Sequence, residues 1–262
     1  MQPIVVTKLH KSVVNALEIL SGTSPDPLLA SAGSDFIIHL TRLPTSSDTP
    51  HTPAPLLSLK GHLRPVTALL PLPTDSLLSA SADGSVRMWD IRSGTQQARW
   101  LMPKPAVALA SGTNDASGDA WVALADGSVR LVDRRASTSA AKWSGGVAAR
   151  TIAVSADGQE IALGAADGTV TQFDVRGGAI RKQWRRSGAP VECLSFAPGG
   201  RVVVGGEDGL PYVVDFTRGD DDAGLHISEL VFGNVEAVRA LRISGELVYM
   251  AGDGGVVRKY QL

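Results

Sequence analysis

The side chains that most often carry out chemistry are few and far apart in this sequence. Five histidines stand at His10, His39, His51, His62 and His226. No two of them have the short spacing of a metal-binding pair, and neither a Gly-x-Ser-x-Gly nucleophile motif nor a glycine-rich phosphate loop is found. The single cysteine, Cys193, excludes an intramolecular disulfide and a cysteine zinc cage, and its apolar surroundings indicate a buried thiol. The sequence therefore predicts no catalytic residue, no bound metal and no cofactor.

The composition also bears on the class of partner. With Lys+Arg 25 against Asp+Glu 26, no overall charge draws the chain onto nucleic acid or an anionic membrane. The first residues lack the pattern of a signal peptide, and no apolar run approaches the roughly 18 residues of a membrane helix. We therefore expect a cytoplasmic or nuclear protein without a transmembrane segment, whose partners are other proteins or peptides.

One short motif recurs at a nearly constant interval. Asp-Gly pairs begin at Asp83, Asp126, Asp167 and Asp208, which are 43, 41 and 41 residues apart. Weaker copies occupy 30–35, with Phe36 in place of the glycine, and 249–255. Three tryptophans each follow an Asp-Gly aspartate by 17 residues, namely Trp100, Trp143 and Trp184. Six copies of one repeat therefore fill the chain.

Each repeat has the pattern of a small antiparallel sheet. Apolar runs flank each Asp-Gly turn, and further runs before and after them give about four short strands per repeat. One such sheet cannot cover its two apolar faces, so neighbouring sheets must stack against it. We therefore expect an all-β fold, a single six-bladed β-propeller over residues 1–262 with four-stranded antiparallel blades. The repeats are approximately 10–59, 60–102, 103–144, 145–187, 188–233 and 234–262.

The first and last residues predict how the propeller closes. The last repeat reaches Leu262 with only three strand-like runs, whereas residues 1–9 lie before His10, in the place of a fourth strand. We expect residues 1–9 to complete the last blade and close the ring. Residues 44–55 are rich in Pro, Ser and Thr without apolar periodicity, which predicts a flexible loop in the first blade.

The second repeat resembles the WD-repeat signature. It reads Lys60-Gly61-His62, then Asp83-Gly84, then Met88-Trp89-Asp90. The resemblance implies a buried polar relay that joins His62, Ser81 (or Ser79), Asp83 and Trp89, and such a relay pairs polar groups that would otherwise be buried alone. His10 stands at the corresponding place in the first repeat. The other repeats depart from the Trp-Asp pair, and we expect them to rely on apolar packing.

The resemblance also implies a non-catalytic scaffold for protein–protein interaction, monomeric within a multiprotein complex. Propellers of this kind bind partners on the face whose loops enter the innermost strands. The residues expected at the channel mouth, two before each first strand, are Ser12, Arg64, Lys104, Val147, Ala189 and Glu236. Because Arg64 and Lys104 belong to adjacent blades, this face favours an acidic peptide or a phosphate.

Three alternative functions rest on other residues. Asp-x-Arg boxes resemble those of substrate receptors of cullin-type ubiquitin ligases, and they pair Asp90 with Arg92, Asp133 with Arg135 and Asp174 with Arg176. Local pairing at a strand end is the structural explanation of the same residues. Arg185 and Arg186 resemble a phosphoinositide-binding motif, although cations on an outer strand also prevent aggregation. A propeller hydrolase or lactonase would need a metal held in the central channel.

Overall fold

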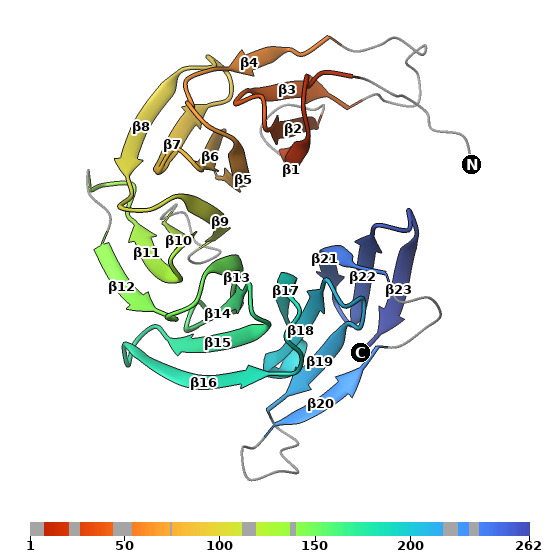
Figure 1. The fold of residues 1–262 in the computed structure, drawn as a ribbon. Helices are drawn as coiled ribbons and strands as arrows, with labels where there is room; N and C mark the ends of the chain where they lie inside the picture. Colours follow the sequence, from red (N-terminus) through yellow and green to blue (C-terminus); the bar gives the residue numbers. More distant parts are fainter. Residues whose placement is uncertain are drawn as a thin grey trace. The chain divides into compact units, whose positions relative to one another are not determined.

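The computed structural model describes residues 8–20, 27–43, 54–73, 75–111, 119–136, 140–216, 225–230 and 236–262. These residues form 23 β-strands in six antiparallel sheets, with one short 3-10 turn at Pro198–Gly200 (Figure 1). Five of the described sheets have four strands and the last has three. The fold class predicted from the repeats, an all-β chain built from the six blades of a β-propeller, is confirmed. The proposed closing strand falls on residues 1–7 and the proposed loop mostly on 44–53, and both ranges lie outside the described residues.

The described residues divide into two compact units. The first takes those up to Leu109 together with 132–136, and the second takes 110–111, 119–131 and those from Ala140 onward. Blade 1 of the first unit consists of β1 (Val14–Leu20), β2 (Leu28–Gly33), β3 (Ile38–Arg42) and β4 (Leu57–Leu59). Blade 2 consists of β5 (Val66–Leu72), β6 (Ser76–Ser81), β7 (Ser85–Asp90) and β8 (Gln96–Leu101).

The remaining four sheets follow in chain order. Blade 3 consists of β9 (Ala106–Ser111), β10 (Ala120–Leu124), β11 (Ser128–Val132) and β12 (Ala140–Ser144), and the division between the units falls within β9. Blade 4 consists of β13 (Ala149–Val154), β14 (Glu160–Ala165), β15 (Thr169–Asp174) and β16 (Ala179–Arg185). Blade 5 consists of β17 (Val191–Ala197), β18 (Arg201–Gly206), β19 (Tyr212–Asp215) and β20 (His226–Glu229). Blade 6 consists of β21 (Val238–Ser244), β22 (Leu247–Gly252) and β23 (Val257–Gln261).

The sheets cover one another's apolar faces. Every residue of the second strand β6 is buried, and so is every residue of β10, which means that neither face of these strands meets water. In the first unit one apolar cluster joins Leu40 and Leu59 of blade 1 to Trp89 of blade 2. In the second unit Trp184 of blade 4 lies in one cluster with Val202 of blade 5. Burial of this kind stabilises by about 25 cal/mol per Å² of apolar surface.

The tryptophan marker of the sequence has a structural meaning. Trp100, Trp143 and Trp184 stand on the fourth strands of blades 2, 3 and 4, opposite Val86, Val129 and Val170 respectively. The constant interval of 17 residues therefore reports the same strand pairing in three successive blades.

The turn between the second and third strands has one geometry in all six described blades. A residue of positive φ ends each turn, and its N–H donates to the carbonyl three residues earlier, as in Gly168 to Ala165 at 3.3 Å. Phe36 takes this position in blade 1 with a φ of 70°, a conformation that costs a non-glycine residue free energy. In blade 6 the residue is Gly255, so Asp253 lies one place earlier than the other turn aspartates.

We expect Gly168→Ala to destabilise the protein strongly, because φ is +86° and a Cβ would lie 2.0 Å from the Ser187 carbonyl oxygen. Gly146→Ala is the matched control, since its φ is +74° and no atom lies within 4 Å of its Cβ. The control measures backbone strain alone, about 1 kcal/mol, and the clash should raise the cost at Gly168 above about 2 kcal/mol. Urea unfolding of both variants measures the difference, and equal losses of stability would contradict the close approach.

Candidate interaction face

The six residues predicted at the channel mouth hold one register. Each lies two positions before the residue at which a first strand begins, and those strands are β1, β5, β9, β13, β17 and β21. The first unit contains Ser12, Arg64 and Lys104, and the second contains Val147, Ala189 and Glu236. Counting from the repeat therefore placed all six on equivalent loops.

A bulge near the start of the first strand ties neighbouring blades together in the first unit. One extra residue shifts the pairing of β1 at Asn15 and of β5 at Thr67. Asn15 Nδ2 donates to the carbonyl of Val66 at 2.9 Å, and Thr67 Oγ1 donates to the carbonyl of Ala106 at 2.9 Å. The starts of β1, β5 and β9 are thereby linked side by side. The three loops before them form a row that we call the cationic row, defined by Lys11–Val13, Leu63–Arg64 and Pro103–Lys104.

The cationic row combines positive charge with apolar surface. Lys11, Arg64 and Lys104 are exposed, and Val13 and Leu63 beside them are 67% and 73% exposed. The aspartates of the adjoining turns do not neutralise these cations at the surface, because the side chains of Asp35 and Asp83 are only 9% and 4% exposed.

The equivalent bulges of the second unit carry charges that pair with one another. They fall at Arg150, Glu192 and Arg239. A guanidinium nitrogen of Arg150 lies 4.0 Å from Glu192, and Glu192 lies 3.7 Å from Arg239. Arg239 donates to both oxygens of Asp253 at 3.0 and 2.9 Å, and this hydrogen bonding raises the pKa of Arg239. The charges of this unit are therefore largely compensated within it.

The polar relay of blade 2 runs through Ser79. His62 Nδ1 lies 3.0 Å from Asp83 Oδ2, and His62 Nε2 lies 2.8 Å from Ser79 Oγ. Trp89 Nε1 donates to the same hydroxyl at 2.8 Å. Ser81 instead donates to the Arg64 and Pro65 carbonyls and accepts the N–H of Asp83. The serine of the relay is therefore Ser79 and not Ser81, because only the hydroxyl four residues before the aspartate reaches both rings.

Burial sets the protonation of this relay. It lowers the pKa of His62 and so favours the neutral ring. Burial also raises the pKa of Asp83, but hydrogen bonds from Ser85, His62 and Leu63 outweigh it and bring the pKa to about 2. Asp83, His62 and Ser79 thus have the connectivity of a catalytic triad. Ser79 is fully buried and already receives an indole N–H, so no substrate carbonyl reaches its hydroxyl and the group is structural.

Blade 1 repeats the relay in part. His10 Nδ1 lies 3.0 Å from Asp35, and His10 Nε2 lies 2.8 Å from Ser31 Oγ. Thr41 stands where blade 2 has Trp89, since both pair with the equivalent leucine of the second strand. The sequence identified His10, and the shared spacing of four residues from serine to aspartate would also have identified Ser31.

The aspartates of the Asp-x-Arg boxes are occupied in turns. The carboxylate oxygen of Asp90 accepts the backbone N–H of Arg92 at 2.9 Å. Asp133 and Asp174 accept that of Arg135 at 2.7 Å and of Arg176 at 2.8 Å. The three arginines are exposed, but the Arg92 guanidinium donates to Asp75 at 2.6 Å. Each box therefore stabilises a turn through the backbone, not through an Asp–Arg side-chain pair.

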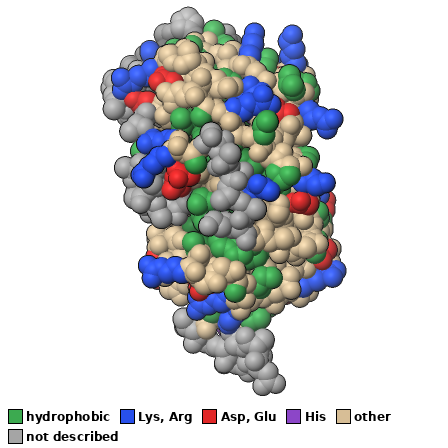
Figure 2. Space-filling view, turned by 90° about the vertical axis from the view of Figure 1, so that its left-hand side faces the viewer, with side chains coloured by type: hydrophobic (Ala, Val, Ile, Leu, Met, Phe, Trp, Pro, Cys, Tyr) green, Lys and Arg blue, Asp and Glu red, His purple; other side chains and the backbone are tan. Residues whose placement is uncertain are grey.

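The paired arginines of blade 4 are engaged with carboxylates. Arg186 lies 3.1 Å from Asp208 and 3.2 Å from Glu229, and its guanidinium lies over the Tyr212 ring. Arg185 lies 4.0 Å from Asp167. On the face shown in Figure 2, Lys and Arg side chains are scattered among acidic and hydrophobic areas and do not gather in one patch. These contacts agree better with charged outer strands than with a lipid-binding site.

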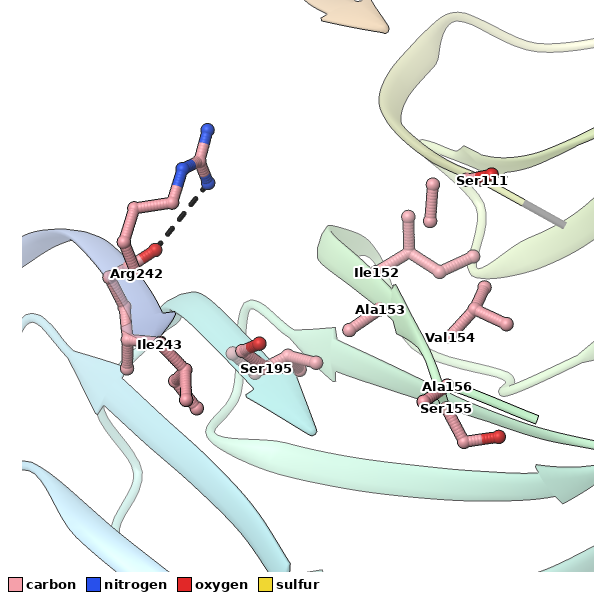
Figure 3. Close-up of a pocket in the computed structure, with 12 residues that line it drawn as sticks. Ser111, Ile152, Ala153, Val154, Ser155, Ala156, Ser195, Arg242 and Ile243 are labelled. Atoms are coloured by element: carbon pink, nitrogen blue, oxygen red, sulfur yellow. Dashed lines mark hydrogen bonds between the residues drawn. The ribbon is translucent and has the colours of Figure 1, made fainter. Parts of the chain in front are cut away.

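A hollow of about 330 Å³ lies in the second unit along the first strands (Figure 3). Its lining comes from β13, β17 and β21 and consists mainly of small and apolar side chains with serine hydroxyls. Arg242 is the one charged residue among the described residues that line it, and it donates to the Leu241 carbonyl at 3.4 Å. A second hollow of about 730 Å³ shares Val154 and Ser195 with it. The first hollow offers neither imidazole nor carboxylate, the ligands that a hydrolytic metal needs.

Comparison with known proteins places the signature repeat. A family model described as "WD domain, G-beta repeat" matches residues 53–90, which include all four relay residues of blade 2. A protein named mitochondrial division protein 1, from Sclerotinia sclerotiorum, is 32% identical over 146 residues, or 54% of this chain. A ribosome biogenesis protein BOP1 homolog from Chlamydomonas reinhardtii is 35% identical over 72 residues, or 26% of this chain. Coronin-7 from Rattus norvegicus is 38% identical over 73 residues, or 27% of this chain.

The matched regions are small parts of these relatives. They cover 19%, 9% and 8% of the respective proteins. The likeness therefore concerns the repeat itself and not the whole relatives. In the described part of the chain, no helix is both long and apolar enough to cross a membrane.

We expect Ser79→Ala to cost about 2 to 4 kcal/mol, because it leaves the His62 and Trp89 ring nitrogens buried without a partner. Ser31→Ala in blade 1 is the control, since it removes a partner from His10 alone. Its expected cost is about 1 to 2 kcal/mol. Denaturant unfolding measures both, and a control at least as damaging as Ser79→Ala would refute the shared hydroxyl.

Acid should weaken the same relay. Because the folded-state pKa of Asp83 is depressed from 3.8 to about 2, its stabilisation is present above pH 4 and is lost as the pH falls toward 2. The wild-type protein should therefore exceed Asp83→Asn in unfolding free energy at pH 5, and the gap should narrow steadily toward pH 2. A gap that stays constant over this range would show that the carboxylate is not selectively stabilised by folding.

Proposed function

Because the chain is a WD-repeat protein, we propose that it acts as a non-catalytic interaction scaffold that binds an acidic, partly apolar segment of a partner protein through the cationic row. The observation that carries the proposal is the linked register of β1, β5 and β9, which sets Ser12, Arg64 and Lys104 side by side.

The chemistry of the row favours this partner. An arginine guanidinium can bind a carboxylate through two parallel hydrogen bonds, and a lysine adds a second positive charge. Leu63 and Val13, which are largely exposed, supply apolar anchors next to these cations. Backbone hydrogen bonds from Asn15 and Thr67 hold the row in place before the partner arrives, which lowers the entropic cost of binding.

The second unit is proposed to contribute shape more than charge. Its positions in the same register, Val147, Ala189 and Glu236, are half-buried. The nearby Arg239 and Asp253 neutralise each other. The relatives are named for mitochondrial division, ribosome biogenesis and the coronins, and this variety supports a general interaction module over a single process.

We expect the double variant Arg64→Ala with Lys104→Ala to bind a short fluorescein-labelled peptide rich in glutamate and leucine about tenfold more weakly than wild type. Fluorescence polarisation measures the affinity, which should also fall as salt rises because the charges are exposed. Arg135→Ala removes an exposed arginine outside the row and should leave binding unchanged. Wild-type affinity in the double variant, or an equal loss in the control, would exclude the row as the binding site.

A further inference from the structure

Blade 1 differs from blade 2 at two side chains of the relay. His39 pairs with Ser31 across the sheet, as Arg87 pairs with Ser79, so His39 occupies the place of an arginine. In the same register Thr41 occupies the place of Trp89. Both replacements lie beside the bond between His10 and Asp35.

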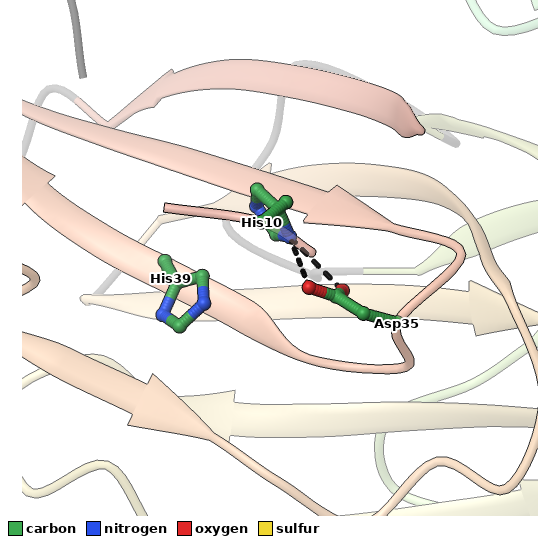
Figure 4. A group of neighbouring side chains, drawn as sticks. All are labelled: His10, Asp35 and His39. Atoms are coloured by element: carbon green, nitrogen blue, oxygen red, sulfur yellow. Dashed lines mark hydrogen bonds and ion pairs between the residues drawn. The ribbon is translucent and has the colours of Figure 1, made fainter. Parts of the chain in front are cut away.

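The first replacement brings three metal-binding side chains together (Figure 4). His10, Asp35 and His39 each offer one ligand atom, and these atoms lie within 4.8 Å of one another. The centroids of the two imidazoles are 4.7 Å apart, and His10 Nδ1 lies 3.0 Å from Asp35 Oδ1. The donors of a tetrahedral zinc shell with bonds of 2.0 to 2.1 Å are roughly 3.4 Å apart, so small side-chain movements suffice.

The outer ring nitrogens are already held. His10 Nε2 lies 2.8 Å from Ser31 Oγ, and His39 Nδ1 lies 2.9 Å from Ser58 Oγ. A histidine that binds a metal through one nitrogen usually donates its other N–H to a fixed acceptor, which orients the ring. The serine hydroxyls are such acceptors, and they leave His10 Nδ1 and His39 Nε2 to face Asp35.

The second replacement frees the tautomer of His10. In blade 2 the Trp89 indole donates to Ser79, which favours the Ser79 hydroxyl hydrogen pointing to His62 Nε2 and the ring hydrogen lying on Nδ1. In blade 1, Thr41 Oγ1 is buried and has no hydrogen-bond partner among the described residues. Ser31 therefore receives no indole N–H and can accept the Nε2–H of His10. The Nδ1 lone pair is then available to a metal.

The charge balance of blade 1 also suits a cation. In blade 2 the Arg87 guanidinium lies 3.8 Å from Asp83 and supplies a permanent positive charge. In blade 1 burial lowers the pKa of His39 and favours its neutral form, which is the form that binds metals. The Asp35 carboxylate thus faces two neutral imidazoles where Asp83 faces one imidazole and a cation.

We propose that His10, Asp35 and His39 bind one zinc ion, with water as the fourth ligand. Two nitrogen donors and one oxygen donor suit zinc and neighbouring transition metals, whereas magnesium and calcium prefer oxygen alone. The ion takes the place of the Arg87 charge and joins the loop before β1 to the turn and strand β3. The long separation of the ligands in sequence explains why their spacing gave no sign of the site.

Isothermal titration of the metal-stripped full chain with zinc chloride tests this site. We expect one ion per chain with a Kd in the micromolar range or tighter, and a rise in melting temperature on zinc addition. His39→Gln should weaken zinc binding at least tenfold, because an amide replaces an imidazole ligand. His226→Gln, which removes a histidine of blade 5, should bind zinc as the wild type does.

Asp35→Asn provides a second test that keeps the shape of the side chain, and circular dichroism of the metal-free variants checks that each is folded. Cobalt substitution of the wild type should give the intense visible bands of a tetrahedral site, and these should be lost in both blade 1 variants. Absence of zinc binding to the wild type would overturn the proposal. Zinc binding that survives both variants, or that His226→Gln weakens equally, would also overturn it.

Discussion

The blades depend on a turn that leaves little space for a side chain. The loop that enters the next first strand lies with its backbone against this turn, so a Cβ on Gly127 would come within 2.1 Å of the Val147 carbonyl oxygen. The same holds at Gly209, where a Cβ would lie 2.5 Å from the backbone of Glu236. The turn thereby fixes where the following strand begins. Strand register, the repeat length and the place of the interaction loops all follow from this contact.

This dependence explains why so much of the fold could be predicted from spacing. A turn that requires positive φ selects glycine, and the Asp-Gly interval therefore counts blades directly. The interaction loops could be found by counting because each first strand starts at a fixed distance from the turn before it. Phe36 shows the limit of composition, since it adopts the turn geometry without being a glycine, and only the periodicity located it.

Other features left no mark in the sequence. Ser79 and Ser81 are both small and fully buried, and only the pleat of β6 decides which hydroxyl meets the rings of His62 and Trp89. The bulge at Asn15 adds one residue without a characteristic type, so its bond to the neighbouring blade could not be foreseen. His10 and His39 are far apart in the chain and meet only because two different segments of blade 1 converge.

The buried relays and the surface charge of the loops are two sides of one arrangement. In the first unit the turn aspartates Asp35 and Asp83 point inward to histidines, which leaves the adjoining cations of the loops without an acidic neighbour in the turn. In the second unit the turn aspartate has no such histidine among the described residues and serves the surface, as Asp208 does with Arg186. Burial of a carboxylate in the core of one blade therefore sets the charge that its loop presents to a partner. A change of one relay histidine would alter the stability of the blade and also the electrostatics of the face above it.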